Sequence, residues 1–520
     1  MGFSRVHSAQ ATSIETAVVS VETDVSNGLR SFSLVGLPNR SVEEARDRIS
    51  SAIKNTGFRS PKHRNQKVVV SLAPASIKKE GTSFDLAIAL GYLQSVNEIS
   101  FKENGSVFIG ELSLNGELKP INGVLPITQK ALESGFKRIF LPRENAEEAS
   151  FVKNIEIYGA SSLFEVITHI NRKQDREYNP PKSIALQPTT PIKRRSKVFK
   201  EDLCDIKGQE SAKRALEICA AGRHNIAMYG PPGAGKTLLA RALISILPPL
   251  NEDQIFETTS LHSVAGTLSK ENPLVTDPPF RSPHHTSSPA AVIGGGTVPQ
   301  PGEITLSHNG ALFLDEFPEF DRRIIEALRE PMEEGSVSIS RSLGKVKFPA
   351  NFILVAAFNP CPCGYQGSEK VACTCTANDI GRYRKKMSGP IMDRIDLWCN
   401  VEAIPHRKLS SRERGGEESS KDVRIRVMKA TARQKRRLSK DGILSNKDMS
   451  ARDISRKARL TEKAENILIT SSERMNLSAR VFHKTIKISR TIADLEGSDD
   501  IKEGHVLEAL QYRPSLTIGL

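Results

Sequence analysis

The sequence contains no apolar run long enough to cross a membrane. A spanning helix needs about 20 consecutive apolar residues, and the first dozen residues also lack the apolar core of a signal peptide. Internal repeats of roughly 20–50 residues, which would indicate a solenoid or propeller, are absent as well. We therefore expect a cytoplasmic protein that has no membrane partner.

Cysteine is scarce, with 7 in 520 residues, which is unlike a secreted disulfide framework. Cys361, Cys363, Cys373 and Cys375 nevertheless lie close together. Four thiolates can bind Zn²⁺ tetrahedrally and leave no open coordination position, which predicts a structural rather than a catalytic site. Because C-x-C pairs are less usual zinc ligands than C-x₂₋₄-C pairs, reduced thiols or a redox-labile disulfide remain alternatives.

The chain has an excess of basic residues, 74 Lys and Arg against 60 Asp and Glu, for a net charge of +14. Such a balance favours polyanionic partners, since basic side chains release counterions from phosphates. A well-solvated surface explains it equally well. At roughly 150 residues per domain, the length predicts about three domains.

Local patterns predict a mixed α/β domain at residues 1–172, a basic mobile linker at 173–200, and an α/β domain with a parallel sheet at 201–402. A polar basic linker at 403–421 and a helical domain at 422–520 follow. In the first domain we expect strands at Ser31–Val35, Lys67–Leu72 and Arg138–Leu141, helices at Val42–Ile53, Leu125–Ser134 and Ser162–Ile170, and a hairpin over Ser106–Ile121 around Asn115-Gly116. In the last we expect helices at Val423–Leu438, Glu462–Ser471, Ser478–Leu495 and Lys502–Gln511.

A phosphate-binding loop begins the chemistry of the middle domain. Residues 230–237 fit the pattern G-x-x-x-x-G-K-[ST], between an apolar stretch at Asn225–Tyr229 and a helical pattern at Leu238–Leu247. The loop amides wrap phosphates, Lys236 adds a point charge, and Thr237 can hold Mg²⁺. The predicted nucleotide-binding residues are Gly230, Pro231, Pro232, Gly233, Ala234, Gly235, Lys236 and Thr237.

Two further strands carry polar residues suited to hydrolysis. Ala311–Leu314 is apolar and is followed by Asp315, which can hold Mg²⁺ through water, and by Glu316, which can orient and deprotonate the attacking water. Phe352–Ala357 leads to Asn359, whose amide can sense the γ-phosphate. The alternative for Asn359 is a turn, because Asn-Pro favours turn initiation.

Six short segments of the sequence carry a family resemblance: SLVGLP from Ser33, KEGTSFD from Lys79, PFRSPHH from Pro279, NPCPCG from Asn359, GPIMDRID from Gly389 and SRTIADL from Ser489. With them the sequence resembles the AAA+ ATPases, and within them the magnesium-chelatase-like ComM/YifB family. The resemblance implies a ring, with a hexamer expected, and ATP sites between subunits. It casts Arg394 as an arginine finger donated to the neighbouring nucleotide and Arg480 as a second sensor on the helical lid; the alternative for each is a surface salt bridge.

Two segments have the character of substrate-handling insertions. One is Glu257–Gln300, which includes His284-His285, and the other is a predicted hairpin at Val337–Phe348 with Arg341 and Lys345 near its tip. Basic hairpin tips suit a phosphodiester backbone, because gripping it requires charge but no reading of bases. A solvated loop is the alternative for the hairpin. The two histidines suit contact with substrate or a metal, or a structural role.

In the first domain, Lys79–Ser83 and the later region Gly110–Leu141 resemble the Lon-type protease fold, in which a serine nucleophile works with a lysine base. Ser83 falls at the position of the nucleophile, but Leu125 stands where the lysine would align, and Lys130 is a poor substitute by its spacing. A serine without a base is a weak nucleophile. We therefore interpret the domain as a non-proteolytic relative that serves assembly or substrate binding.

These interpretations predict an ATP- and Mg²⁺-dependent ring motor. The family resemblance implies branch migration or helicase-type remodelling of single-stranded or branched DNA during recombination of incoming DNA. One alternative is a chelatase-like or protein-remodelling ATPase that acts on a partner protein. An ATP-dependent peptidase is a further alternative, against which the missing lysine counts.

Overall fold

The computed structural model describes residues 2–12, 15–63, 65–102, 105–171, 183–192, 201–296, 299–341, 344–367, 371–387, 389–404 and 418–513. Two compact units divide the chain. The first comprises residues 1–194, 255–275 and 297–300, and the second comprises the remainder. None of the described helices combines the length and apolarity needed to cross a bilayer.

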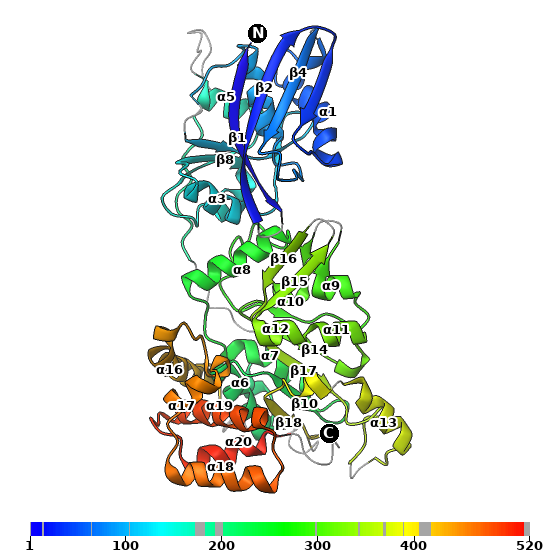
Figure 1. Cartoon of the computed structure of the whole chain (residues 1–520), viewed down its shortest axis with the longest axis vertical. Coiled ribbons are helices and arrows are strands. Elements are labelled where there is room, and N and C mark those ends of the chain that lie inside the picture. The colour runs from blue at the N-terminus through cyan, green and yellow to red at the C-terminus, as the bar shows by residue number, and fades with distance from the viewer. Residues whose placement is uncertain are drawn as a thin grey trace. The chain divides into compact units, whose positions relative to one another are not determined.

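The first unit is built on a seven-stranded mixed sheet in the order β3-β4-β2-β1-β5-β8-β9. Its centre is a long antiparallel pair, β1 (Phe3–Thr12) and β2 (Glu15–Asn27), which the sequence analysis did not predict. Along β2, buried positions that include Val19, Val21 and Val25 alternate with more exposed ones, as expected for a strand with one face on the core. The other elements are β3 (Ser31–Val35), α1 (Arg40–Asn55), β4 (Gln66–Ala73), α2 (Asp85–Ser95), β5 (Ser106–Phe108), β6 (Glu111–Leu112), β7 (Leu118–Lys119), α3 (Val124–Glu133), β8 (Arg138–Pro142), α4 (Ala146–Ala149), β9 (Glu156–Ala160) and α5 (Leu163–Ile170) (Figure 1).

Helix α2 is buried along nearly its whole length and packs on β1 and β2. Gly91 permits this approach, because a Cβ there would lie 2.8 Å from Thr23 Oγ1. At the start of the helix, the buried Asp85 pairs with Arg48 at 3.0 Å. Burial outweighs this pairing and raises the pKa of Asp85 to about 7.

The hairpin expected over Ser106–Ile121 is wrong in its first part. Strand β5 lies in the main sheet, parallel to β1 and β8, because all three of its side chains are buried. The antiparallel hairpin is shorter and consists of β6 and β7. Its turn contains Asn115-Gly116, as predicted, and is closed by a hydrogen bond from Ser113 N to Glu117 O.

Part of the expected linker at 173–200 is packed rather than mobile. Within its described residues, 183–192, Gln187 N donates to Ile157 O of β9 and Ile184 is buried. Thr190 and Ser150 hydroxyls are 2.6 Å apart. The backbone therefore continues along the sheet edge, because a free edge strand offers it hydrogen-bond partners.

Residues 255–275, which follow the phosphate loop in sequence, pack with the first unit. They contain most of α8 (Glu252–Val264). The buried carboxylate of Glu148 accepts hydrogen bonds from Leu125 N, at 2.8 Å, and from Ser263 Oγ of α8. Burial raises the pKa of Glu148. Part of the segment predicted to handle substrate is therefore occupied by packing within this unit.

The second unit contains a five-stranded sheet in the order β11-β14-β17-β10-β18, and all of its pairings are parallel, as predicted. The predicted hairpin is also present, as β15 paired with β16. The elements are α6 (Glu210–Gly222), β10 (Ile226–Tyr229), α7 (Lys236–Ile246), β11 (Phe280–Arg281), α9 (Pro289–Ile293), β12 (Gly294–Gly295), β13 (Gln300–Pro301), α10 (Glu303–Leu306), β14 (Ala311–Leu314), α11 (Arg322–Ala327), α12 (Arg329–Glu334), β15 (Ser336–Arg341), β16 (Gly344–Pro349), β17 (Ile353–Phe358), α13 (Ala377–Lys386), α14 (Gly389–Met392) and β18 (Leu397–Asn400).

A helical lid follows the sheet within the same unit. It consists of α16 (Ser420–Leu438), α17 (Ala451–Lys457), α18 (Glu462–Arg474), α19 (Ala479–Glu496) and α20 (Glu503–Gln511). Because Ser419 caps α16 by accepting from Asp422 N, the helix begins inside the linker expected at 403–421. Of that linker, residues 405–417 lie outside the described part.

Candidate functional site

The predicted nucleotide-binding residues meet at one edge of the parallel sheet. Residues 230–237 follow β10, Asp315 follows β14, and Asn359 follows β17. These three strands are neighbours in the sheet. Their carboxyl ends therefore share an edge, which is where open α/β sheets bind ligands.

The loop at residues 230–237 has the backbone that a phosphate cradle requires. Gly233 and Gly235 have φ values of 74° and 91°, which favour glycine. At Gly230, a Cβ would lie 2.0 Å from Val401 O, so the neighbouring strand also excludes a side chain. Helix α7 begins at Lys236, and its free amides face the loop.

Lys236 connects the loop to Asn359. Its Nζ donates to Gly230 O at 2.7 Å, to Pro231 O at 3.0 Å and to Asn359 Oδ1 at 3.1 Å. Burial lowers the pKa of Lys236, and the charge of Asp315 opposes this shift. The ammonium and the amide are thus together at the point where a γ-phosphate would lie beyond the loop.

The predicted Mg²⁺ ligands are also in contact. Thr237 Oγ1 donates to Asp315 Oδ2 at 2.9 Å. The other oxygen, Asp315 Oδ1, accepts from Glu316 N at 3.0 Å. A hydroxyl and a carboxylate beside a phosphate cradle are the oxygen ligands that Mg²⁺ takes together with nucleotide phosphates.

The side chain of Glu316 contacts His285, a residue whose role the sequence analysis left open. The backbone of Glu316 is left-handed, with φ 52°, and its Oε2 lies 3.0 Å from His285 Nδ1. His284 instead contacts Thr286. The order of the strands could have predicted this contact. His285 follows β11, the strand next to β14, so the loop of His285 and Glu316 lie at the same edge of the sheet.

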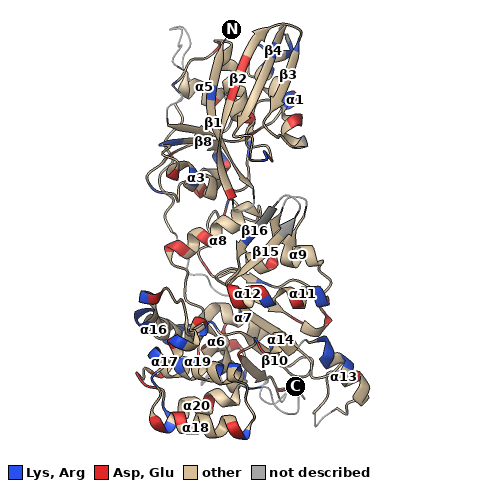
Figure 2. Ribbon diagram, in the orientation of Figure 1, with Lys and Arg blue, Asp and Glu red and all other residues tan. Residues whose placement is uncertain are grey.

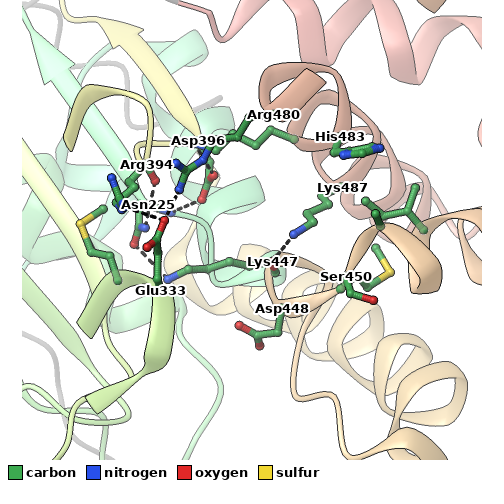
Figure 3. Close-up of a pocket in the computed structure, with 15 residues that line it drawn as sticks. Asn225, Glu333, Arg394, Asp396, Lys447, Asp448, Ser450, Arg480, His483 and Lys487 are labelled. Atoms are coloured by element: carbon green, nitrogen blue, oxygen red, sulfur yellow. Dashed lines mark hydrogen bonds and ion pairs between the residues drawn. The ribbon is translucent and has the colours of Figure 1, made fainter. Parts of the chain in front are cut away.

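Arg394 and Arg480 lie together at the opposite edge of the sheet. Both guanidinium groups bind Glu333 Oε1, at 2.7 Å and 2.6 Å (Figure 3). Arg394 comes shortly before β18 and Arg480 from the first turn of α19. The four-residue strand β10 separates this edge from the phosphate loop by roughly 13 Å. Arg480 is therefore grouped with Arg394 and not with Lys236 of its own chain.

The two arginines line a cationic pocket of about 360 Å³ between the sheet and the lid. Lys447, Lys484 and Lys487 also line it. Lys484 pairs with Asp396 at 3.1 Å. Burial acts to raise the pKa of Asp396, but Lys484, His224 and Lys447 outweigh it and hold that pKa far below its usual range. Glu333, Asp396 and Asp448 line the pocket as well, so its basic side chains are partly neutralised within the chain.

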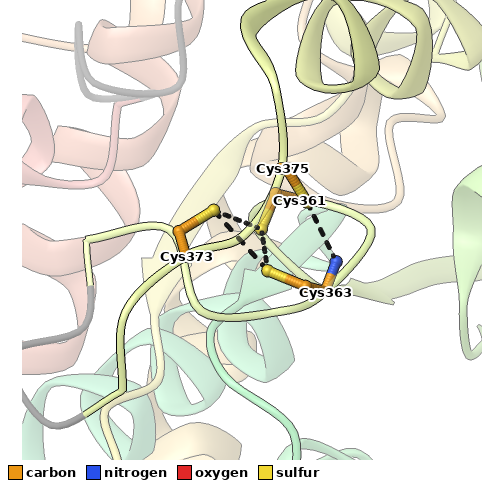
Figure 4. A group of neighbouring side chains, drawn as sticks. All are labelled: Cys361, Cys363, Cys373 and Cys375. Atoms are coloured by element: carbon orange, nitrogen blue, oxygen red, sulfur yellow. Dashed lines mark hydrogen bonds between the residues drawn. The ribbon is translucent and has the colours of Figure 1, made fainter.

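The four clustered cysteines converge after Asn359 (Figure 4). Cys361, Cys363 and Cys373 sulfurs lie 3.4, 3.7 and 3.5 Å apart in pairs, and all four sulfurs lie within 4.8 Å of one another. A disulfide would require about 2.0 Å, whereas sulfurs bound tetrahedrally at about 2.3 Å from zinc lie roughly 3.8 Å apart. The arrangement suits a zinc ion. Amides of Tyr365 and Thr374 also lower the pKa of Cys363 to about 6.

Other predicted residues belong to the first unit or have side chains that the structure does not describe. Ser83 is buried, and its Oγ has no hydrogen-bond partner within the described part of the chain. Leu125 is fully buried, and Lys130 pairs with Glu133 at the surface. The side chains of Arg341 and Lys345 lie outside what the structure describes.

Comparison with known proteins identifies the family. Residues 202–409 match the family described as magnesium chelatase, subunit ChlI, and residues 21–145 and 417–513 match the families described as subunit ChlI of Mg-chelatase and the ChlI C-terminal part. The chain is 39% identical to Competence protein ComM of Haemophilus influenzae, over 99% of this chain and 98% of that protein. It belongs to the ComM/YifB family.

Other relatives agree with this assignment. YifB of Escherichia coli is 38% identical over 99% of this chain and 97% of its own length. Lon protease 2 of Bacillus subtilis is 28% identical over 32% of this chain and 31% of its own, consistent with the Lon-like likeness. Membership of this magnesium-chelatase-like AAA+ family supports an ATPase that uses ATP and Mg²⁺.

Replacing His285 tests whether its contact with Glu316 orients that carboxylate for ATP hydrolysis. We expect His285→Ala to lower kcat for ATP hydrolysis by about tenfold with little change in KM, because the carboxylate loses its orientation but remains present. Glu316→Gln should retain ATP binding and lose turnover by ~100-fold or more, as removal of a general base does. His284→Ala, which leaves the His285–Glu316 contact in place, is the matched control. Equal losses in both histidine variants would contradict this role.

Proposed function

We propose that this protein is an ATP-driven ring motor that acts on DNA and remodels branched strands during recombination of incoming DNA. The observation that carries the ring is the position of Arg394 and Arg480 at the sheet edge opposite the phosphate loop. Support for DNA comes from the net charge of +14 and from the 39% identity to a relative named as a competence protein.

Both arginines then serve the nucleotide of a neighbouring subunit. Their shared partner, Glu333, supplies one negative charge to two guanidinium groups, so one positive charge stays uncompensated by this pairing. In a ring of repeated head-to-tail contacts, the edge that carries these arginines faces the phosphate loop of the next subunit. A cation placed there stabilises transition-state charge on the γ-phosphate.

Mixing two inactive variants tests this division. Lys236→Ala removes the phosphate contact, and Arg480→Ala removes the second arginine. If Arg480 acts on the neighbour, random mixed rings regain about a quarter of wild-type ATPase activity, because that share of interfaces pairs an intact loop with an intact Arg480.

The same recovery is expected when Lys236→Ala is mixed with Arg394→Ala. Mixing Lys236→Ala with Glu316→Gln provides the control, since both changes fall on the loop side of the interface and no complete site forms. An Arg480 that acts on its own nucleotide gives no recovery in the Arg480→Ala mixture.

The four cysteines serve this motor as a structural zinc site. Gly364 of the cysteine loop, with φ 84°, approaches the phosphate loop so closely that a Cβ would lie 2.6 Å from Pro232 Cδ. The sensor residue Asn359 lies only two residues before Cys361. Bound zinc would hold this loop, and thereby Asn359 and Pro232, in place.

Metal analysis tests the zinc assignment. We expect about one zinc per wild-type chain and none after Cys363→Ser with Cys373→Ser, because two ligands are lost. The KM for ATP should rise several-fold in that variant as the loop beside Pro232 loosens. Cys204→Ser, outside the cluster, is the control. Zinc retained by the double variant, or zinc absent from the wild-type protein, contradicts the assignment.

DNA remodelling is tested on one preparation with a labelled four-way junction and a forked duplex. We expect ATP-dependent conversion of the junction, none with a non-hydrolysable analogue or with Glu316→Gln, and ATPase activity stimulated by DNA at low salt. ATPase activity that is indifferent to single-stranded and branched DNA contradicts the proposal. That result would favour the second candidate, a chelatase-like motor that acts on a partner protein. This candidate is supported by the matches to chelatase families in all three parts of the chain.

A further inference from the structure

The helical lid carries a second cationic surface, separate from the pocket that holds Arg394. A groove of about 620 Å³ lies between α16 and the end of α17. Figure 2 shows Lys and Arg gathered on both helices. The groove is lined by Lys429, Arg433, Arg436 and Arg437 of α16, by Arg456, Lys457 and Arg459 at the end of α17, and by Ala432, Asp494 and Asp499.

Internal ion pairs account for only some of these charges. Arg437 binds the buried Asp494 at 2.6 Å, and Lys457 binds Asp441. Arg433 reaches Asp499 at 3.7 Å. The remaining cations are exposed and have no acidic partner among the described residues; these are Lys429, Arg436, Arg456 and Arg459.

The positions of these cations form a track. Lys429, Arg433 and Arg436 lie on one face of α16, since residues three and four apart are neighbours on a helix. From Lys429 to Arg436 the helix rises about 10 Å, which spans roughly three phosphates at 3.4 Å per nucleotide. Arg456 lies in the last turn of α17, where the helix dipole favours a cation.

Repulsion among these basic side chains lowers the stability of helix α16 when nothing is bound. Like charges at i and i+4, such as Lys429 and Arg433, destabilise a helix, and no acidic residue alternates with them on this face. A polyanion removes that repulsion. Arginine forks match phosphate oxygens in pairs, and contacts of this kind hold a backbone without reading bases.

We propose that this lid groove binds the phosphodiester backbone of nucleic acid. Among the described residues that line the groove, only Ala432 is apolar, and these residues include none of the aromatic anchors that dominate protein–protein interfaces. The inference rests on the proposed function and extends it, because it gives the helical lid a DNA contact of its own. ATP-driven motion of the lid would then pull on the strand directly.

The test compares two triple variants of the full chain with equal loss of charge. Lys429→Gln, Arg436→Gln and Arg456→Gln remove unpaired groove cations. Arg452→Gln, Lys463→Gln and Arg474→Gln are the control, because these exposed residues belong to the same lid but do not line the groove. Binding of labelled single-stranded DNA and of a four-way junction is measured by fluorescence anisotropy over a salt series.

For the groove variant we expect the slope of log affinity against log salt to fall by about 2, and the affinity at 0.1 M salt to fall on the order of 10- to 100-fold. Its ATPase activity without DNA should equal that of the wild type. The control should bind like the wild type. If both triple variants weaken equally, net charge alone is responsible and the groove assignment is wrong.

Other outcomes separate this inference from the proposed function. A wild-type protein that binds no DNA defeats both. A wild-type protein that remodels junctions while the groove variant binds DNA normally defeats the groove alone. If the groove variant keeps its affinity for DNA but loses affinity for a labelled polyglutamate peptide, the groove takes an acidic protein instead.

Discussion

The buried amide of Asn225 joins the parts on which the catalytic unit depends. Its backbone N donates to Asp396, its Oδ1 accepts from Leu354 N and from Lys447 Nζ, and its Nδ2 donates to Arg394 O. These bonds tie β10 to its two neighbouring strands, to the segment of Arg394 and to the lid. A buried amide left unpaired is costly, so every partner must keep its position for the others to be satisfied.

In the proposed ring, the reaction is divided between two edges of one sheet. Strands β10 and β17, which Asn225 joins, lead to the phosphate loop and Asn359, whereas Arg394 and Asp396 lie before the start of β18. Among the described residues, Lys236, Asp315 and Glu316 lie at one edge and Arg394 and Arg480 at the other. A parallel sheet with such different edges suits a repeated head-to-tail assembly, in which each contact completes a site. The proposed lid groove adds a further surface on the part of the chain that carries Arg480, since Arg480 and Arg436 belong to the same helical lid.

Local sequence predicted most of the elements that bear the chemistry. The glycine spacing of residues 230–237 and the apolar runs before Asp315 and Asn359 depend on neighbours in the chain, and the structure has a strand or helix at each. Predictions based on pairing between distant segments were weaker. Strand β5 was interpreted as half of a hairpin, because its burial by β1 and β8 is not visible locally. The packed residues 183–192 were interpreted as a linker for the same reason.

By itself, the sequence determined that the protein binds a nucleoside triphosphate, which family it resembles, and which residues are candidates to bind phosphate and metal. These depend on residue types at short spacings. Only the tertiary structure decided which of them meet. It joined His285 to Glu316 across adjacent strands, and Arg480 to Arg394 through Glu333. It also brought four cysteines within 4.8 Å and gathered the lid cations along a groove. These contacts depend on strand order and helix packing, which place side chains from distant parts of the chain at one edge or on one face.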